Sequence, residues 1–384
     1  MRIAMIGQKG IPFSEDGGGV DRHVEELSTR LADLGHEIFV YVRPRFTESK
    51  VSDYKGIKLI SVRSVPTKNL DSITHTFFAI KDLIFKRKVD IVHFHGVGPG
   101  SLAWLVRFLN PSIKIVGTFH SIDRYHKKWG WFARMYLGWG ERAICKFPHL
   151  TIAVSQSIKK YCKEKFNKDT KYIPNGVGIV SVNTDELLKQ FGLTKDGYFL
   201  TVARLVRHKG IHHLIEAYKK LEKKFGKINA KWPNKKLKKL VIVGSPSYTE
   251  DYLKYLKQIA GSSKNIIFTG FQGGETLDQL FSNAFLYIHP SESEGLSTTI
   301  LESLSHRTPA LISDITENLE VIDHSGFIFK TKSPISLYRQ MVKLLQNPEL
   351  IEEKKNRAQR FIKKNFNWNH LVKITGKAYK TLLD

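Results

Sequence analysis

Two glutamates lie eight positions apart in the stretch PSESEGLSTTILESL (290–304), with a glycine and several hydroxyl side chains between them. The stretch follows a short apolar run that predicts a buried strand, and its second half predicts a helix. Ser297, Thr298 or Thr299 can cap that helix, whose first turn offers free amides and a positive dipole end to a phosphate. Gly295 lets the backbone approach such a ligand. Glu294 and Glu302 could then bind sugar hydroxyls on either side, although a capped helix with solvated glutamates fits the spacing equally well.

A second candidate site is the basic loop in ARLVRHKG (203–210), which follows the first predicted strand of the second half of the chain. Arg204 and Lys209 are five positions apart, and Gly210 comes next. Two cations at a strand end can hold a diphosphate, the arginine as a bidentate fork and the lysine as a point charge. Because basic loop residues are commonly just solvated, this loop alone does not identify a site.

Histidines end two predicted strands in the first half of the chain. His120 ends SIKIVGTFH (112–120), and His93 and His95 lie two positions apart in VDIVHFH (89–95). Residues two apart on a strand share one face, so this pair could suggest a metal site. The sequence shows no third ligand, and packing is the simpler interpretation. A lone histidine at a strand end is more often structural than functional.

The elements that must position these residues alternate between strand and helix. Apolar residues at helical spacing predict a helix from Val20 to Leu34, after the strand RIAMIG (2–7), and Gly35 ends it. The opening GQKGIP (7–12) lacks the G-x-G-x-x-G pattern of dinucleotide-binding proteins, which disfavours a dehydrogenase. Further strands are expected at EIFVYV, GIKLISV, VDIVHFH, SIKIVGTFH, LTIAVS and KYIPNGV, with helices over 72–87 and 101–109.

The same alternation begins again after a less regular stretch near 180–195. Strands are expected at YFLTVARL, LKKLVIVGS, KNIIFTGF, FLYIHPS, TPALISD and GFIFK, each followed by helical segments. This α/β pattern predicts two Rossmann-like domains, each a doubly wound parallel sheet, that face a cleft. We place the N-terminal domain at 1–180, the C-terminal domain at 190–365 and a last helix at 366–384. Ligands of such sheets bind at the carboxyl ends of the strands, where the candidate sites lie.

The composition is that of a globular protein with a strong positive charge. The 384 residues are 41% hydrophobic, and 61 Lys and Arg against 36 Asp and Glu give a formal charge of +25. This charge suits polyanionic partners, although a lysine-rich solvated surface explains it equally well. No apolar run reaches the ~20 residues that span a bilayer, and no signal peptide is evident, so a cytoplasmic protein is expected. Cys145 and Cys162 fit no zinc or redox motif and indicate a reducing compartment.

An aromatic and basic segment spans residues 124–146. Phe132, Met135, Trp139 and Ala143 fall at helical spacing, among Lys127, Lys128, Arg134, Arg142 and Lys146. Such helices are typical of a membrane interface, and a stripe that packs in the core is the alternative. A nucleic-acid partner is not expected, because no recognised nucleic-acid-binding fold is present.

Together these motifs resemble the retaining glycosyltransferases of family four, which have the GT-B fold. The resemblance covers nearly the whole chain and rests on Glu294 and Glu302 in an E-x7-E pattern, Arg204 and Lys209 before them, GGGVDRHVEELSTRLADLGHE (17–37) and IPNGV (173–177). The stretch KKWGWFARMYLGWGER (127–142) is also similar to rhamnosyltransferase-like members that build bacterial polysaccharides.

The resemblance implies a hexosyltransferase that moves a sugar from a nucleotide diphosphate sugar to an acceptor hydroxyl, usually without a metal ion or other cofactor. Arg204 and Lys209 would hold the donor pyrophosphate and stabilise the leaving group. Glu302 would bind the ribose hydroxyls, and Glu294 would contact the transferred sugar. His120 would lie beside that sugar at the reaction centre.

The resemblance also implies roles for the backbone and for the acceptor side. Amides of Gly295, Leu296 and Ser297 would add to the phosphate site, and Gly18 and Gly19 would bring the first loop near the donor phosphate and the acceptor. The last helix would cross back to the first domain. Family acceptors are often lipid-linked glycans, so the protein could dock on an anionic inner membrane leaflet during polysaccharide biosynthesis.

Several positions depart from the family pattern or stay open. Relatives often continue the PNG motif with Val-Asp, whereas this chain has Val-Gly, so Asn175 is either at the edge of the site or a turn former. Asp123 and Arg124 follow the strand-end histidine, and either could contact the acceptor. Asp21 stands where related sequences often have glutamate, and the sequence gives it no role.

Two other functions stay open on the sequence. Another GT-B enzyme, such as a nucleotide-sugar 2-epimerase, would release free nucleotide without any acceptor. A basic protein that binds nucleic acid or membrane would lose affinity steeply with salt and would tolerate Glu294→Gln and Lys209→Ala. In a glycosyltransferase we expect those two changes to abolish turnover and to leave the fold intact.

Overall fold

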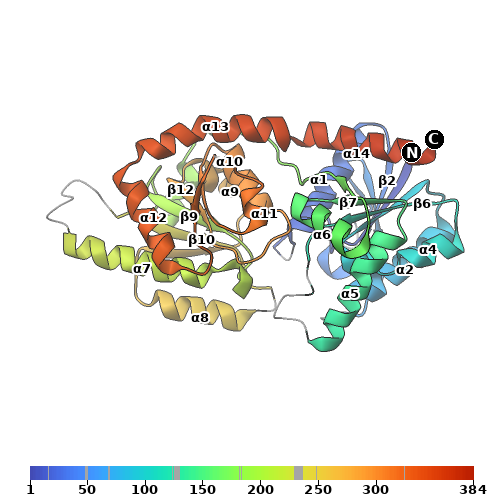
Figure 1. Ribbon diagram of the computed structural model, residues 1–384, viewed down its shortest axis with the longest axis horizontal. Coiled ribbons are helices and arrows are strands. Elements are labelled where there is room, and N and C mark those ends of the chain that lie inside the picture. Colours follow the sequence, from blue (N-terminus) through green and yellow to red (C-terminus); the bar gives the residue numbers. More distant parts are fainter. Residues whose placement is uncertain are drawn as a thin grey trace. The chain divides into compact units, whose positions relative to one another are not determined.

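The structure, a computed structural model, divides into two compact units (Figure 1). It describes all residues except 16, 48–50, 68–69, 123, 125–129, 181, 183, 229–236, 248 and 324. The first unit comprises Met1–Gly176 and Trp368–Asp384, and the second comprises Val177–Asn367. The boundary that the sequence places between 180 and 190 thus lies after Gly176, and the last helix begins at Trp368 rather than at 366.

Over the described residues, the first unit is an eight-stranded sheet with helices on both faces. Its strands are β1 (Arg2–Ile6), β2 (Glu37–Val42), β3 (Asp53–Tyr54), β4 (Ile57–Ser61), β5 (Ile91–His95), β6 (Lys114–Phe119), β7 (Leu150–Ala153) and β8 (Lys171–Tyr172). Its helices are α1 (Gly19–Asp33), α2 (Asp71–Lys86), α3 (Val97–Gly100), α4 (Ala103–Leu109), α5 (Trp131–Lys146), α6 (Gln156–Phe166) and α14 (Trp368–Leu383). The order is β3-β4-β2-β1-β5-β6-β7-β8, and only β3 and β4 pair antiparallel.

Side chains of β1 show why this sheet is covered on both faces. Ile3 and Met5 pack into a core with α1 and α14, whereas Ala4 and Ile6 pack with α2 and α4. Successive strand residues point to opposite faces, so an uninterrupted apolar run requires helices on both sides. The returning helix α14 lies beside α1 (Figure 1).

A buried hydrogen-bonded group ties α14 to the sheet. The Tyr379 hydroxyl lies 2.6 Å from Nδ1 of His93, and the Thr118 hydroxyl lies 2.7 Å from Nε2 of the same ring. Both ring nitrogens of His93 therefore have a partner, which agrees with the packing interpretation of this histidine.

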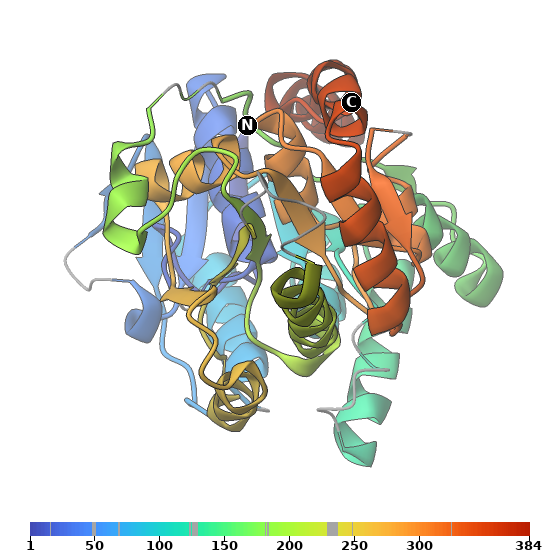
Figure 2. The same cartoon turned by 90° about the vertical axis from the view of Figure 1, so that its left-hand side faces the viewer.

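The second unit repeats the plan with a six-stranded sheet over the described residues. Its strands are β9 (Tyr198–Val202), β10 (Lys239–Val243), β11 (Ile266–Gly270), β12 (Leu286–His289), β13 (Ala310–Ser313) and β14 (Phe327–Phe329). Its helices are α7 (Ile211–Ile228), α8 (Glu250–Ala260), α9 (Gly274–Ser282), α10 (Thr298–Ser305), α11 (Thr316–Leu319), α12 (Pro334–Gln346) and α13 (Glu349–Asn365). The order is β11-β10-β9-β12-β13-β14, all parallel. Helices α7, α8 and α12 pack on one face of this sheet (Figure 2).

Both sheets have a topological switch point. Strand β1 lies between β2 and β5, and β9 lies between β10 and β12, so the chain builds outward from each in both directions. Ligands of open α/β sheets bind outside the carboxyl ends of the strands at such a point. The prediction of two doubly wound parallel sheets is confirmed. Gly18 lies on the loop that leaves β1, and Arg204 and Lys209 lie on the loop that leaves β9.

Candidate functional site

Gly210 allows the loop after β9 to approach the loop after β12. Its φ is +68°, and a Cβ at this position would lie 2.0 Å from the carbonyl oxygen of Pro290. Any side chain would both strain the backbone and collide with that oxygen. The close approach holds Lys209, the preceding residue, against the stretch that carries Glu294.

Lys209, Glu294 and His289 form a compact group in the second unit. Nζ of Lys209 lies 2.5 Å from Oε1 of Glu294, and Nε2 of His289 lies 2.8 Å from the same oxygen. The side chains of Lys209 and Glu294 are only 15% and 9% exposed, so little water competes for these contacts. The sequence singled out Lys209 and Glu294 but predicted neither their contact nor the part of His289.

The surroundings of Glu294 keep its carboxylate charged. Burial raises the pKa of Glu294, but the charge of Lys209 and the hydrogen bond from His289 outweigh it and hold that pKa well below its usual range. Burial lowers the pKa of His289, so its ring is neutral near pH 7. Because a carboxylate only accepts hydrogen bonds, Nε2 of His289 carries the proton, and Nδ1 accepts from the Tyr287 hydroxyl 2.9 Å away. Glu294 is therefore a fixed anion with an oriented donor on each side.

The N-terminus of α10 follows directly. Of the three capping candidates, Ser297 occupies the N-cap position, but its side chain forms no capping hydrogen bond and lies 3.1 Å from the Thr299 hydroxyl instead. An anion can therefore take the place that a capping side chain would otherwise fill. Gly295 and Leu296 are buried beside it. The predicted phosphate contacts of 295–297 fit this geometry and stay a prediction.

Glu302 and Arg204 occupy contrasting environments in the same unit. Glu302 lies inside α10 and is 5% exposed. Arg204 follows β9 with an exposed side chain, and within the described ranges no ion pair to its guanidinium is formed. An exposed guanidinium at the switch point is available to a ligand, whereas Lys209 must share its charge with Glu294. The ribose and pyrophosphate contacts of Glu302 and Arg204 stay predictions.

Asp21 organises the glycine loop after β1 in the first unit. Its carboxylate accepts hydrogen bonds from the amides of Lys9, at 2.5 Å, and Gly18, at 2.6 Å. Gly18 is the N-cap of α1, and Gly19 is the first residue of that helix. A carboxylate at a helix N-terminus is stabilised by the helix dipole, which gives Asp21 the structural role that the sequence left open. The Gly18 amide is therefore already hydrogen-bonded within the protein. Contacts of Gly18 or Gly19 with a nucleotide-sugar donor stay a prediction.

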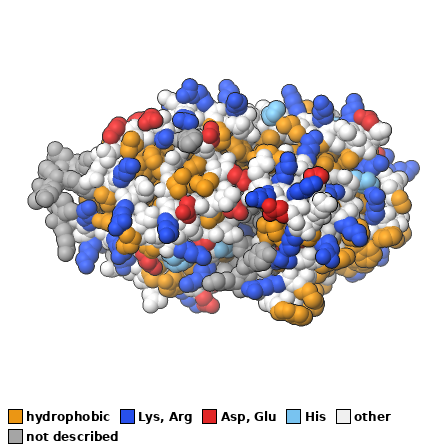
Figure 3. Space-filling view, viewed as in Figure 1, with side chains coloured by type: hydrophobic (Ala, Val, Ile, Leu, Met, Phe, Trp, Pro, Cys, Tyr) orange, Lys and Arg blue, Asp and Glu red, His pale blue; other side chains and the backbone are white. Residues whose placement is uncertain are grey.

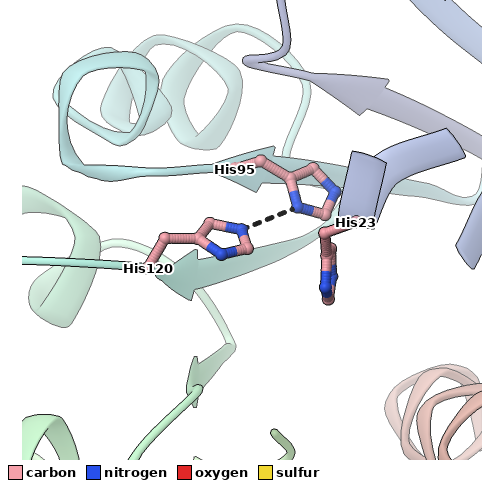
Figure 4. A group of neighbouring side chains, drawn as sticks. All are labelled: His23, His95 and His120. Carbon is pink, nitrogen blue, oxygen red and sulfur yellow. Dashed lines mark hydrogen bonds between the residues drawn. The ribbon is translucent and has the colours of Figure 1, made fainter. Parts of the chain in front are cut away.

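Three histidines from three segments meet in the first unit (Figure 4). His23 lies on α1, His95 ends β5, and His120 follows β6. Nδ1 of His95 lies 3.3 Å from Nε2 of His120, and one nitrogen of each ring lies within 4.8 Å of the others. The expectation that no third histidine accompanies the pair in β5 is therefore wrong for His95. The partners come from α1 and from the end of β6, so spacing within one strand could not reveal them.

These imidazoles are neutral near pH 7. Burial lowers the pKa of His23 to about 4, against a smaller opposite effect of a hydrogen bond with Asn175. Burial and the neighbouring histidines lower the pKa values of His95 and His120 well below the usual range. A neutral imidazole donates from one nitrogen and accepts at the other, so His120 can hydrogen-bond a substrate hydroxyl without adding charge.

The remaining acceptor-side candidates have separate surroundings. Asp123 lies outside the described residues. Nη1 of Arg124 lies 3.6 Å from the buried Glu141 carboxylate, which Lys165 also contacts at 3.4 Å. Asn175 is buried, and its bond to His23 joins it to the histidine group. Acceptor contacts of Asp123, Arg124 and Asn175 stay predictions.

The aromatic stripe of α5 is exposed. The exposed fractions of Trp131, Phe132, Met135 and Trp139 are 78%, 71%, 53% and 45%. The alternative that this stripe packs in the core is thus wrong for Phe132, Met135 and Trp139, and only Ala143 is buried. In the part of the chain that the structure describes, no helix has both the length and the hydropathy to cross a bilayer.

Two family models match the chain, one on each side of residue 180. The model "Glycosyltransferase Family 4" matches residues 17–179, and "Glycosyl transferases group 1" matches residues 183–366. The first match contains the histidine group, and the second contains the Lys209–Glu294 contact.

Relatives of similar length match most of the chain. An uncharacterised glycosyltransferase of Methanocaldococcus jannaschii is 25% identical over 100% of this chain and 99% of its own length. A phosphatidyl-myo-inositol mannosyltransferase of Mycolicibacterium smegmatis is 27% identical over 82% of this chain and 76% of its own. These matches extend through both units.

Solved structures share the fold. Sucrose-phosphate synthase from Thermosynechococcus elongatus matches with a TM-score of 0.84 at 19% identity, over 99% of this chain and 98% of the other. Anabaena HepE in complex with UDP-glucose matches with a TM-score of 0.80 at 17% identity, over 99% of this chain and 100% of the other. The two parallel sheets, the two adjoining family models and these relatives agree: the chain belongs to the glycosyltransferases of family four and has the GT-B fold.

Proposed function

We propose that this glycosyltransferase transfers a sugar from a nucleoside diphosphate sugar to an acceptor hydroxyl and retains the anomeric configuration. The observation that carries the proposal is the contact of Lys209 with Glu294 beside the N-terminus of α10. A largely buried cation, a fixed carboxylate and an uncapped helix N-terminus suit a ligand in which phosphate adjoins sugar hydroxyls. HepE, solved with UDP-glucose, supports a donor of this class.

In this proposal the donor half of the reaction belongs to the second unit. Negative charge grows on the departing diphosphate as its bond to the sugar breaks, and Lys209 and Arg204 stabilise that charge. Amides of 295–297 add hydrogen bonds, and Glu302 binds the ribose. Because the two side chains supply positive charge, the proposed reaction does not depend on a metal ion.

Glu294 is proposed to bind hydroxyls of the transferred sugar. Its partners Lys209 and His289 hold Oε1, so its position is set before the sugar arrives. An oriented carboxylate avoids the entropy loss of ordering a mobile one. His120 of the first unit is proposed to hydrogen-bond the same sugar, with its ring oriented by His95.

We further propose a lipid-linked glycan as acceptor and the inner membrane leaflet as the site of action. The exposed aromatics Trp131, Phe132 and Trp139 lie along α5, and a hydrophobic patch is visible at the lower edge of the face in Figure 3. Arg134, Arg142 and Lys146 of this helix are exposed. Aromatic side chains enter the headgroup region while basic ones bind anionic lipid. The match to the phosphatidyl-myo-inositol mannosyltransferase named above supports a lipid acceptor.

The test is release of nucleoside diphosphate from a panel of nucleotide sugars, with and without a membrane-lipid extract as acceptor. The proposal expects release from one donor, strong stimulation by the extract and a new glycolipid of retained configuration. Release without extract, together with an epimerised free sugar, would indicate the 2-epimerase. Release from no donor, combined with salt-sensitive binding to nucleic acid or vesicles, would contradict the enzyme assignment.

A further inference from the structure

The group of His23, His95 and His120 has the spacing of a metal site. Two nitrogens on one tetrahedral zinc ion, each at about 2.0–2.1 Å from the metal, lie roughly 3.3–3.4 Å apart. Nδ1 of His95 and Nε2 of His120 are separated by 3.3 Å, and a nitrogen of His23 lies within 4.8 Å of both. Ring nitrogens from α1, from β5 and from the residue after β6 thus lie close together around one point.

The second nitrogen of His95 already faces a partner that suits metal binding, and within the described residues His23 has a buried nitrogen without a hydrogen bond. Nε2 of His95 lies 3.5 Å from the sulfur of Met5. This sulfur is a weak acceptor for an N–H at Nε2, and a ring protonated there keeps the lone pair of Nδ1 for a metal ion. Among the described residues, Nδ1 of His23 is buried and has no hydrogen-bond partner, so this nitrogen is not engaged by another protein group. Partners of this kind fix the tautomer and orientation of metal-binding histidines.

Other clusters are weaker candidates. His212, His213 and Glu292 also lie close together. However, Nδ1 of His212 is 2.8 Å from the Tyr252 hydroxyl, and the Glu292 carboxylate contacts both His213 and Lys332. A bound ion there would have to displace the lysine. His93 is excluded, because both of its nitrogens have buried partners.

We propose that His23, His95 and His120 form a binding site for a divalent transition-metal ion of the zinc class. Three neutral imidazoles favour Zn²⁺, Cu²⁺ or Ni²⁺ over Mg²⁺ and Ca²⁺, which prefer oxygen. His23 and His120 keep 6% and 7% of their surface exposed, which gives the ion access. The ion replaces the hydrogen bond between His95 and His120 and leaves a fourth position for water.

Occupancy of this site would inhibit sugar transfer. The metal takes the Nε2 lone pair of His120 and places a positive charge beside the ring that is proposed to contact the sugar. This inhibition rests on the proposed function, whereas the metal binding does not. Zinc inhibition of an enzyme that needs no metal for turnover is the expected behaviour.

The direct test is a titration of the full chain with Co²⁺, followed by visible absorption and calorimetry under reducing conditions. We expect one tight site with the ligand-field bands of four-coordinate Co²⁺, displaced by Zn²⁺. His95→Gln and His23→Gln should each weaken binding by more than about 100-fold, the upper range for loss of an outer-shell partner. His213→Gln is the matched control and should bind as the wild type does.

The melting temperature of each variant without metal shows whether it folds. Because His23 and His95 lie on different elements, the second variant still tests the site if the first one does not fold. Unchanged binding in a folded His95→Gln or His23→Gln protein would overturn the site, as would loss of binding in His213→Gln. If metal binds but the measured sugar transfer does not change, the metal site is supported and the proposed contact of His120 with the sugar is contradicted. Absence of any transfer would leave the binding result to decide the metal site alone.

Discussion

Lys209 and Glu294 make direct contact, with Nζ 2.5 Å from Oε1, although 85 residues separate them along the chain. Gly210 makes the contact sterically feasible, and the neighbouring strands β9 and β12 bring the two loops to the same edge of the sheet. The two residues that the sequence assigns to pyrophosphate and to sugar are thus one electrostatic unit before any donor binds.

This contact predicts that Lys209→Ala destabilises the second unit. Removing one member of a largely buried ion pair leaves the other charge uncompensated and costs about 3–5 kcal/mol. The sequence analysis expects this variant to keep its fold, and we now expect that fold to have a lower free energy of unfolding. Urea unfolding of Lys209→Ala, Glu294→Gln and the double variant should give a double-variant loss well below the sum of the single losses.

The matched control is Lys332→Ala. Lys332 also pairs with a glutamate, Glu292, at 3.3 Å, but its side chain is 63% exposed. An exposed pair contributes about 0–1 kcal/mol, so this variant should unfold almost as the wild type does. Equal losses for Lys209→Ala and Lys332→Ala would show that burial of the Lys209 pair contributes nothing.

The charge of Glu294 predicts a pH dependence of stability. The pKa of Glu294 lies well below its ordinary value of 4.5 in the folded chain. A lowered pKa gives stability that is complete above that ordinary value and is lost as the pH falls through the folded value. The melting-temperature difference between the wild type and Glu294→Gln should stay constant from pH 8 to about pH 5 and shrink below about pH 4.5. A difference that grows on acidification would contradict the assigned charge state.

His289 is predicted to be a positioning residue for Glu294. His289→Ala removes the N–H that holds Oε1, and a displaced carboxylate should lower kcat by up to about 100-fold. The donor KM should change less, because Lys209 and the α10 amides remain. His289→Gln places an amide donor near the position of Nε2 and should restore much of kcat. Equal defects of the alanine and glutamine variants, or a loss confined to KM, would argue against this role.

Tyr379→Phe tests how the returning helix is held. The change leaves Nδ1 of His93 buried without its partner, which costs about 1–3 kcal/mol. Denaturant unfolding should show this loss without a change in the folded spectrum. Tyr338→Phe, at a half-buried tyrosine whose hydroxyl has no hydrogen bond within the described ranges, serves as the control and should have little effect.

The exposed face of α5 predicts binding to anionic vesicles. The double variant Trp131→Ala, Phe132→Ala removes the two most exposed aromatics of the helix without touching the core. Flotation with phosphatidylglycerol vesicles should fall several-fold for this variant, whereas the melting temperature should not change. Binding that is equal for wild type and variant, or absent from the wild type, would remove α5 from the membrane proposal.

The fold could be predicted well from the sequence because its signals are local. Uninterrupted apolar runs such as those of β1 and β12 are typical of strands buried on both faces, and helical spacing marks α1 and α7. The short antiparallel strand β3 was not predicted, because two residues carry too little pattern. The last helix begins at Trp368 rather than at 366, and helix boundaries are weakly encoded in sequence.

The candidate site could be predicted only in part, because its chemistry depends on tertiary contacts. Glu294 and Lys209 were found through their motifs, but their contact depends on the order of strands in the sheet. The part of His289 was not predicted, although this residue directly precedes Pro290 of the same motif. An ionisable residue at the end of an apolar strand was the signal that could have revealed it. His23 shows no comparable signal, because only the packing of α1 brings it to His95 and His120.

The most direct test of the central claim is a thermal-shift panel of UDP, GDP, dTDP, ADP and their sugars, without added metal. Ligand that binds the folded state raises the melting temperature by mass action. We expect one nucleoside diphosphate to raise the melting temperature of the wild type and of Lys332→Ala, and we expect Lys209→Ala to lose this rise. A panel in which no nucleotide shifts the wild type, or in which Lys209→Ala responds as the wild type does, would contradict a donor site built on the Lys209–Glu294 contact.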